Sequence, residues 1–334
     1  MATIKDVAKK ANVSIATVSR VINARGKYSK EVEKRVLDAA KSLNYTINFR
    51  AKGLKTGKTG VIAISIPDYY KIHYPEILTT IVPHLSSKDF HVDLLVNIRL
   101  QKIYNYIKEG RYDGLIIISP EQDDRAIHNI IKEKIPTIFA YKEIEREDVS
   151  TVSIDFFQAG YLATKHLIRS GHKSIVFVGL DYESYASNEI ERGYLFAHDE
   201  YGIQYREENI LIFDRSEPFN LYMRSLKELI KKSLSFSAVL TTDHLNAYII
   251  LKLLYVLGLK IPDDVSVVAC GERSKLRYTI PDLTTVILPI EQTAILSSEI
   301  LVNALLNNDN VVKRIKLMVQ ISEGKSVLKR LTKI

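Results

Sequence analysis

The amino-terminal stretch, residues 3–23, limits most strongly what this chain can fold into. Its first half repeats apolar residues at the spacing of one helix face, and they are Ile4, Val7, Ala8 and Ala11. Asn12 interrupts this period, because Asn tolerates the left-handed backbone that ends a helix better than most residues. Ser14 then stands where the N-cap of a second short helix belongs. The pattern predicts two short helices joined by a tight turn, which is a helix-turn-helix.

The second of these helices is predicted to turn its small and polar side chains outward. Its inward positions are Val18, Val21 and Ile22, and its outward positions are Ile15, Ala16, Thr17, Ser19, Arg20 and Asn23. In the DNA major groove Arg reads guanine, and small apolar groups meet thymine methyl groups. A third helix, from residue 29 or 30 to residue 43, would close a small core with Val32, Val36, Leu37, Ala39, Ala40 and Leu43. The alternative interpretation is an ordinary helical hairpin inside a larger core.

The charge of the chain is concentrated at this end. Residues 1–60 hold 14 Lys and Arg against 4 Asp and Glu, a net charge of +10, whereas the whole chain is +8. A basic head on a nearly neutral body is typical of a phosphate-binding surface rather than of a device for solubility. The charge pattern therefore favours DNA as the partner of the helix-turn-helix.

A short basic linker that contains glycine follows, at residues 48–58. The stretches 3–8, 13–14, 17–23, 43–45 and 51–54 closely resemble the DNA-binding headpiece of the Lac repressor (LacI/GalR) family. In that family the linker folds into a hinge helix on the operator, and the leucine at the position of Leu54 wedges into the minor groove. An apolar wedge flanked by basic side chains also suits the kinking of a base step.

The resemblance implies roles for individual residues of the headpiece. Arg20 would contact bases, Ile15 and Ala16 would select bases by apolar fit, and hydroxyl groups would hold phosphates. The implied DNA-binding set is Thr3, Ser14, Ile15, Ala16, Thr17, Arg20, Asn23, Tyr28, Ser29, Asn48, Ala51, Leu54 and Lys55. A homodimer would present two such headpieces to a palindromic operator.

A glycine-rich stretch in the linker superficially suggests a nucleotide-binding loop. Between Gly53 and Gly57 the chain has three residues, one fewer than a Walker A motif requires, and no buried strand precedes it. We therefore do not expect nucleotide binding there.

The length, composition and cysteine content of the chain limit the kinds of protein that it can be. With 334 residues it is long enough for two or three domains, and 46% hydrophobic and 26% charged residues are globular values. It has no apolar run of about 18 residues and no apolar signal-peptide core at its start, so we expect a cytoplasmic protein without membrane spans. The single cysteine, Cys270, excludes an internal disulfide framework and a cysteine-cluster zinc site. We expect no metal and no cofactor.

After residue 60 short apolar runs alternate with helical periods. The buried runs are expected at residues 61–66, 92–96, 113–119, 136–140, 152–155, 174–179, 210–213, 238–242 and 265–269. Such alternation predicts parallel sheets with helices on both faces, and its restart near residue 157 predicts two lobes. A ligand would lie beyond the carboxyl ends of the strands.

The body resembles the effector-binding core of the same family more thinly, at residues 113–115, 136, 170–172, 262–268 and 283–286. The resemblance implies a doubly wound α/β body like a periplasmic binding protein behind an α-helical headpiece. The expected domains are a headpiece at 1–46, a hinge at 47–59 and a core at 60–334. The first lobe would hold residues 60–156 and 287–317, and the second lobe residues 157–286 and 318–334.

Strand ends and the family pattern together select candidate effector-binding residues. They are His73, Tyr74, Ser119, Asp155, Arg192 and Thr242. Arg192 is placed by the resemblance at an arginine that holds an effector hydroxyl or carboxylate, a task that suits its planar fork of donors. For each, the alternative is a surface residue or a lobe-interface residue.

Two positions depart from the family pattern. Gly271 replaces a carboxylate that commonly accepts from sugar hydroxyls, and Tyr141 stands where an Asp is frequent. These losses leave open a different sugar or a sugar phosphate as effector. Cys270 is interpreted as a strand-end packing residue, because no His or Asp flanks it at a catalytic spacing.

The sequence therefore predicts a DNA-binding transcription regulator, most simply a repressor of carbohydrate-utilisation genes controlled by a small sugar-like effector. Two other classes fit the sequence less well. A solute-binding protein would share the body but not the headpiece, and an enzyme would need a metal cluster, nucleophile elbow or cofactor loop that the sequence lacks. A protein co-regulator in place of a small molecule stays open, as do the operator, the effector and the sign of its response. The chain end at residues 329–334 has no leucine heptad, which favours a dimer over a tetramer.

Overall fold

The computed structural model describes residues 3–22, 26–43, 58–67, 74–120, 123–180, 184–213, 219–231, 236–307, 309 and 311–330. The chain divides into two compact units, Met1–Thr59 and Gly60–Ile334. We call the first the headpiece and the second the body.

Within its described residues, 3–22, 26–43 and 58–59, the headpiece contains three helices, α1 (Ile4–Ala11), α2 (Ile15–Ile22) and α3 (Lys30–Ser42). Asn12 has the left-handed backbone predicted for it, with φ 52°, and ends α1. The buried core comprises Val7, Ala8, Ala11, Val18, Val21, Val36 and Ala39. The prediction that Leu37 belongs to this core was wrong, since 51% of it is exposed. Leu37 lies about 100° around α3 from Val36 and outside the stripe that Val32, Val36, Ala39 and Leu43 turn toward the core.

The first lobe of the body is built on a six-stranded sheet with the order β11-β5-β4-β3-β1-β2. All of its neighbouring strands run parallel. Its strands are β1 (Val61–Ile66), β2 (His91–Val96), β3 (Gly114–Ile118), β4 (Thr137–Tyr141), β5 (Ser150–Ile154) and β11 (Arg314–Leu317). Its helices are α5 (Tyr74–Ser86), α6 (Leu100–Lys108), α7 (Asp124–Lys132) and α13 (Ile290–Asn307).

The second lobe repeats this plan with the order β12-β10-β9-β8-β6-β7, in which only β12 runs antiparallel to its neighbour. Its strands are β6 (Ile175–Leu180), β7 (Ile210–Phe213), β8 (Ala238–Thr241), β9 (Ser266–Gly271), β10 (Thr284–Ile287) and β12 (Gln320–Ser322). Its helices are α8 (Phe156–Arg169), α9 (Tyr185–Glu200), η1 (Glu207–Asn209), α10 (Phe219–Lys231), α11 (His244–Val256) and α12 (Arg273–Leu276).

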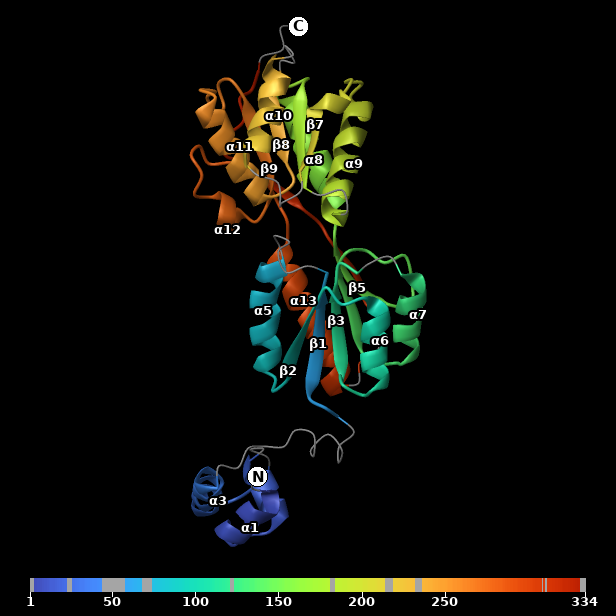
Figure 1. The fold of residues 1–334 in the computed structure, drawn as a ribbon, viewed down its shortest axis with the longest axis vertical. Coiled ribbons are helices and arrows are strands. Elements are labelled where there is room, and N and C mark those ends of the chain that lie inside the picture. Colours follow the sequence, from blue (N-terminus) through green and yellow to red (C-terminus); the bar gives the residue numbers. More distant parts are fainter. Residues whose placement is uncertain are drawn as a thin grey trace. The chain divides into compact units, whose positions relative to one another are not determined.

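Helices cover both faces of each sheet (Figure 1). In the first lobe α5 and α13 pack on one face and α6 and α7 on the other, so successive side chains of β1 enter different cores. Ile62, Ile64 and Ile66 face the α5 side, whereas Ala63 faces the α6 side. In the second lobe α8 and α9 cover one face and α10 and α11 the other. These two-sided cores explain why the strands read as continuous apolar runs in the sequence.

The chain crosses between the sheets three times, after β5, after β10 and after β11. After β10 it returns to the first lobe as α13, which contributes Leu301 and Leu305 to the core there. None of the described helices is long and apolar enough to cross a membrane.

Helices α8 and α9 approach each other closely because glycines lie at their contact. A Cβ atom added to Gly160 would collide with the backbone of Ile190, and one added to Gly193 would collide with the backbone of Phe157. Both obstacles are main-chain atoms, which cannot rotate away. The close spacing of α8 and α9 therefore depends on having glycine, which has no side chain, at both positions.

We expect Gly193→Ala to destabilise the body, because the added methyl group must push α9 away from α8. Overpacking of this kind costs roughly 1–3 kcal/mol. A lower midpoint of urea unfolding would measure it. Glu200→Ala, at an exposed position of the same helix, is the matched control and should leave the midpoint unchanged. An unchanged midpoint for Gly193→Ala would mean that the two helices separate freely.

Candidate DNA-binding surface and effector site

The outward face of α2 carries the residues predicted to read bases. Ile15 is 45% exposed although it is apolar, and Ala16 and Arg20 are also exposed. Val18 and Val21, on the opposite face, are buried in the three-helix core. The core thus holds α2 rigidly while it leaves an apolar, cationic face uncovered, which is the arrangement that a groove-reading helix needs.

Three residues predicted to contact phosphates also cap the headpiece helices. Ser14 Oγ accepts a hydrogen bond from the Thr17 backbone N–H at 3.1 Å and lies 2.8 Å from the Thr17 hydroxyl. Ser29 Oγ accepts from the Val32 N–H at 3.2 Å. The Thr3 backbone N–H and the Thr3 hydroxyl both donate to the Asp6 carboxylate, and these two bonds lower the pKa of that carboxyl. The caps fix the amino ends of the helices, where backbone N–H groups favour phosphate.

Tyr28 is partly exposed on the segment before α3. Several other predicted residues lie outside the described residues: Asn23, Asn48, Ala51, Leu54, Lys55 and His73. Tyr74 begins α5, but its side chain is not among those described. Their roles stay predictions.

The carboxyl ends of the first-lobe strands share an unusual backbone. Asn97 directly follows β2 with φ 53°, Ser119 follows β3 with φ 48°, and Tyr141 ends β4 with φ 78°. Left-handed backbone is uncommon for residues other than glycine, and such residues cluster at ligand sites. The three residues mark the edge of the sheet where a ligand of a parallel α/β fold binds.

One small pocket opens at this edge between β1 and β3. Ser65, Asn97, Arg99, Ser119 and Pro120 line it together with neighbouring apolar residues. Of the predicted residues, only Ser119 is a member of this pocket. Ser65, Asn97 and Arg99 were not among the predicted residues, although Asn97 and Arg99 come directly after a predicted strand end.

Asp155 and Thr242 lie at the edges of the two sheets with structural partners. Asp155 caps α8, its carboxylate accepting from the Gln158 N–H at 2.9 Å. Thr242 is 4% exposed, and its hydroxyl donates to Asp243 at 3.3 Å. Asp243 in turn caps α11 by accepting from two backbone N–H groups. Asp155 is thus held in place as the cap of α8, and Thr242 is held by its bond to the cap of α11.

Arg192 lies on the outer side of α9. Its guanidinium pairs with Glu189 at 2.6 Å and lies 5.8 Å from the centre of the Phe157 ring, and 67% of its side chain is exposed. The inward positions of the same helix, Ile190 and Gly193, pack on α8 instead. A ligand that binds Arg192 must therefore compete with Glu189.

At the corresponding edge of the second lobe, Gly271 ends β9 with φ 152°. An L-residue rarely adopts this backbone, so a carboxylate at this position would also be strained. Cys270, beside it, is fully buried in the core, and burial raises the pKa of its thiol. Tyr141 is buried against the Phe156 ring at a centroid distance of 4.8 Å.

Two charged groups join the lobes across the cleft. Lys275 of α12 reaches Glu76 of α5, with 3.3 Å between Nζ and Oε1. Glu272 lies close to the same pair, and burial together with the Glu76 charge raises the pKa of the Glu272 carboxyl. One oxygen of Glu76 and one of Glu272 are buried without a hydrogen-bond partner. Among the described residues no cluster of three or more His, Cys, Asp or Glu could hold a metal ion.

Comparisons with known proteins agree with both units. Residues 3–48 match the family model "Bacterial regulatory proteins, lacI family", and residues 164–327 match "Periplasmic binding protein-like domain". The HTH-type transcriptional regulator RegA of Clostridium saccharobutylicum is 32% identical over 295 residues, which are 86% of this chain and 88% of that protein.

Solved structures share the fold across nearly the whole chain. The Lac repressor dimer bound to operator and the anti-inducer ONPF has a TM-score of 0.81 at 21% identity, covering 98% of this chain and 99% of that one. The transcriptional regulator CelR in complex with cellobiose has a TM-score of 0.69 at 24% identity, covering 98% of this chain and 100% of that one.

A helix-turn-helix unit joined to a two-lobed, periplasmic-binding-protein-like body defines the class: this protein is a DNA-binding transcription regulator and not an enzyme. More particularly, the chain belongs to the LacI family of bacterial regulatory proteins.

The acidic pair in the cleft predicts a pH-dependent effect of Glu272→Gln. Because the folded protein raises the pKa of Glu272, the native state binds the proton more tightly than the unfolded state does, and stability falls as pH rises through that pKa. Glu272→Gln should therefore raise the urea midpoint at pH 7.5 but not at pH 4, where the wild-type carboxyl is already protonated. The exposed Glu299→Gln is the control. Equal effects at both pH values would contradict the electrostatic cause.

Proposed function

We propose that this protein is a repressor that binds a near-palindromic operator as a homodimer and is controlled by a small sugar-like effector in the cleft of the body. The observation that carries the proposal is the rigid, uncovered face of α2 with Ile15, Ala16 and Arg20. Arg20 reads a base pair, and the two small apolar side chains select by fit. The capped amino ends at Ser14 and Ser29 position the phosphate backbone.

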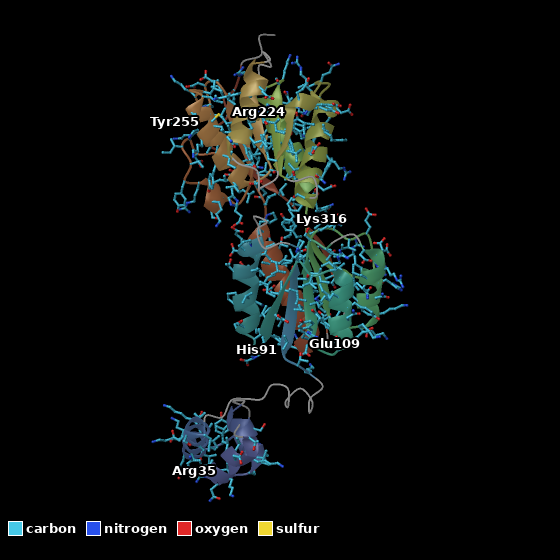
Figure 2. All side chains as sticks on the ribbon, viewed as in Figure 1. Arg35, His91, Glu109, Arg224, Tyr255 and Lys316 are labelled. Carbon is cyan, nitrogen blue, oxygen red and sulfur yellow. The ribbon has the colours of Figure 1, made fainter. Side chains whose placement is uncertain are left out.

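Exposed apolar side chains on the body support the dimer. In the second lobe Tyr255 at the end of α11 is 84% exposed, and Ile280 is 95% exposed (Figure 2 labels Tyr255). In the first lobe Leu94 and Val96 are exposed on β2, an edge strand. Leu94 and Val96 lie two residues apart on β2 and so on the same face of this strand, and neighbouring exposed apolar groups favour a protein partner. A second copy is the partner that a symmetric operator requires.

Effector control follows from the two-lobed architecture. A ligand that contacts both lobes favours one degree of closure, and in a dimer closure changes the spacing of the two headpieces. Coupling of about 1–3 kcal/mol, or roughly 5–150-fold in operator affinity, is typical of such switches. The similar regulator CelR has a complex with cellobiose, which supports a sugar as the effector class. The effector works either as an inducer or as a co-repressor. We place the protein in the cytoplasm, where its DNA partner is.

The first experiment is selection of bound sequences from a random DNA pool with the full-length protein at about 150 mM salt, because affinities depend on salt. One palindromic consensus of roughly 16–18 base pairs with a central CG step is expected, since two headpieces read adjacent half-sites. Recovery of no consensus, both alone and with a panel of sugars and sugar phosphates present, would contradict the proposal.

Arg20→Ala should relax base preference at one symmetric pair of operator positions, because the guanidinium is assigned a base contact. Loss of one such contact costs about 1–3 kcal/mol of discrimination. Competition binding with single-base operator variants measures it. Arg35→Ala removes the same charge from the exposed side of α3 (Figure 2) and should leave the preference intact. Uniform weakening on every sequence would identify Arg20 as a phosphate contact.

Leu54→Ala should lose much of the specific operator affinity and keep the salt-sensitive non-specific binding. The prediction rests on the wedge role implied by the family resemblance, since an apolar wedge stabilises only a kinked site. Titrations of operator and of random DNA over a range of salt separate the two components. Equal losses for both DNAs would count against a wedge.

A further inference from the structure

We propose that the pocket between β1 and β3 is an anion subsite of the effector site, which takes the carboxylate or phosphate group of an acidic sugar. The inference rests on the proposed effector control and names the chemical class of the ligand.

The pocket lies where the connections that leave β1 and β3 run in opposite directions along the sheet. In the first sheet β2 lies on one side of β1 and β3 on the other, so the connections that leave β1 and β3 diverge at this point. Ligands of open parallel sheets bind in the crevice that such a divergence creates at the carboxyl ends of the strands. Ser65 near the end of β1 and Ser119 after β3 form the two sides of this crevice.

The Ser65 side chain also lacks a hydrogen-bond partner among the described residues. Ser65 is 6% exposed and lines the pocket. A buried polar group normally has a partner, and one that lacks it on the wall of a pocket is poised to donate to a ligand.

Arg99 places a positive charge at the mouth of the pocket. Arg99 lines the pocket, and within the described residues its side chain has no ion pair and no hydrogen bond. It is also the N-cap residue of α6, where it supplies no side-chain acceptor, and the first turn of α6 contains no acidic residue. A guanidinium next to a helix amino end favours an oxyanion through bidentate bonds and the helix dipole.

A second cation stands on the other side of Ser119. Lys142 Nζ donates to the carbonyl of Pro120, a pocket residue, at 3.4 Å. Burial lowers the pKa of this amine, and the charge of Asp124 partly restores it. A bound anion would stabilise the charged form of Lys142. Lys142 does not line the pocket itself; it lies beside it through Pro120, and its ammonium is also 5.5 Å from the centre of the Tyr185 ring.

The size of the pocket sets how much of the ligand it takes. Its volume is about 60 Å³, far below the roughly 300–1,000 Å³ of sites that enclose whole ligands. It suits one carboxylate or phosphate group, and the sugar ring would extend from it into the cleft. The pocket would therefore recognise a single acidic substituent of the ligand.

Titration of the full-length protein with inorganic phosphate, at constant ionic strength and by calorimetry, tests the subsite directly. We expect saturable binding that Arg99→Gln weakens roughly tenfold or more, since hydrogen bonds to charged groups are worth about that much. Ser65→Ala should weaken it by less. The control is Arg111→Gln, which removes the same charge at the end of α6 where Arg111 pairs with Glu109. Figure 2 shows Glu109 at the end of the first lobe that is opposite Lys316 and the second lobe. The control therefore removes a charge far from the strand ends that form the pocket.

A second series compares glucose, glucuronate and glucose 6-phosphate on wild type and Arg99→Gln, and it separates a carboxylate from a phosphate preference. Phosphate binding that is absent, or equally strong in Arg99→Gln, overturns the subsite.

Operator binding is measured with the same sugars and with a panel of neutral sugars. If a neutral sugar changes operator affinity equally in both proteins, the effector control stands and the subsite is wrong. If phosphate binding depends on Arg99 but no sugar alters operator affinity, the subsite stands and the effector control fails.

Discussion

Parallel pairing is the constraint on which the rest of the body depends. Strands that all run one way need a helix to return the chain, so helices cover both sheet faces and the strand interiors are apolar. Most side chains in the strand interiors are therefore apolar, and the parallel strands of one sheet bring their carboxyl ends to the same edge. Ser65 and Ser119 in the first sheet and Thr242 in the second lie at such edges. The strand topology therefore determines where the site lies, and the individual residues determine its chemistry.

The three crossings between the lobes limit how the body responds to a ligand. They lie after β5, β10 and β11, at the same edges that carry the polar residues. A change at a strand end is therefore close to a segment that joins the lobes. The close contact of α8 and α9 through Gly160 and Gly193 resists deformation within the second lobe. Each lobe is better suited to move as a body than to change internally, and the Glu76–Lys275 bridge biases that movement.

Periodicity predicted the elements well because burial decides them locally. The headpiece helices, the apolar strands and the outward face of α2 all follow from the spacing of apolar residues, while Leu37 failed because it lies outside the stripe that Val32, Val36, Ala39 and Leu43 turn toward the core. The surroundings of Arg192 could not be predicted, since they depend on which side of α9 packs on α8. The pocket was missed for a similar reason: Ser65 looks like a strand-interior residue, and only the arrangement of β1, β2 and β3 exposes its hydroxyl beside Arg99.

The chemistry of the two sheet edges argues for one kind of selectivity. Hydroxyl groups of neutral sugars are held best by carboxylate acceptors, and two such positions carry Gly271 and Tyr141 here. The groups near the first-lobe pocket are instead donors, the cations Arg99 and Lys142 and the hydroxyl of Ser65. A neutral ligand would desolvate Arg99 without pairing its charge, and an unpaired charge discriminates strongly against the wrong ligand. Exchange of acceptors for donors thus shifts preference from hydroxyl groups to oxyanions without any change of fold.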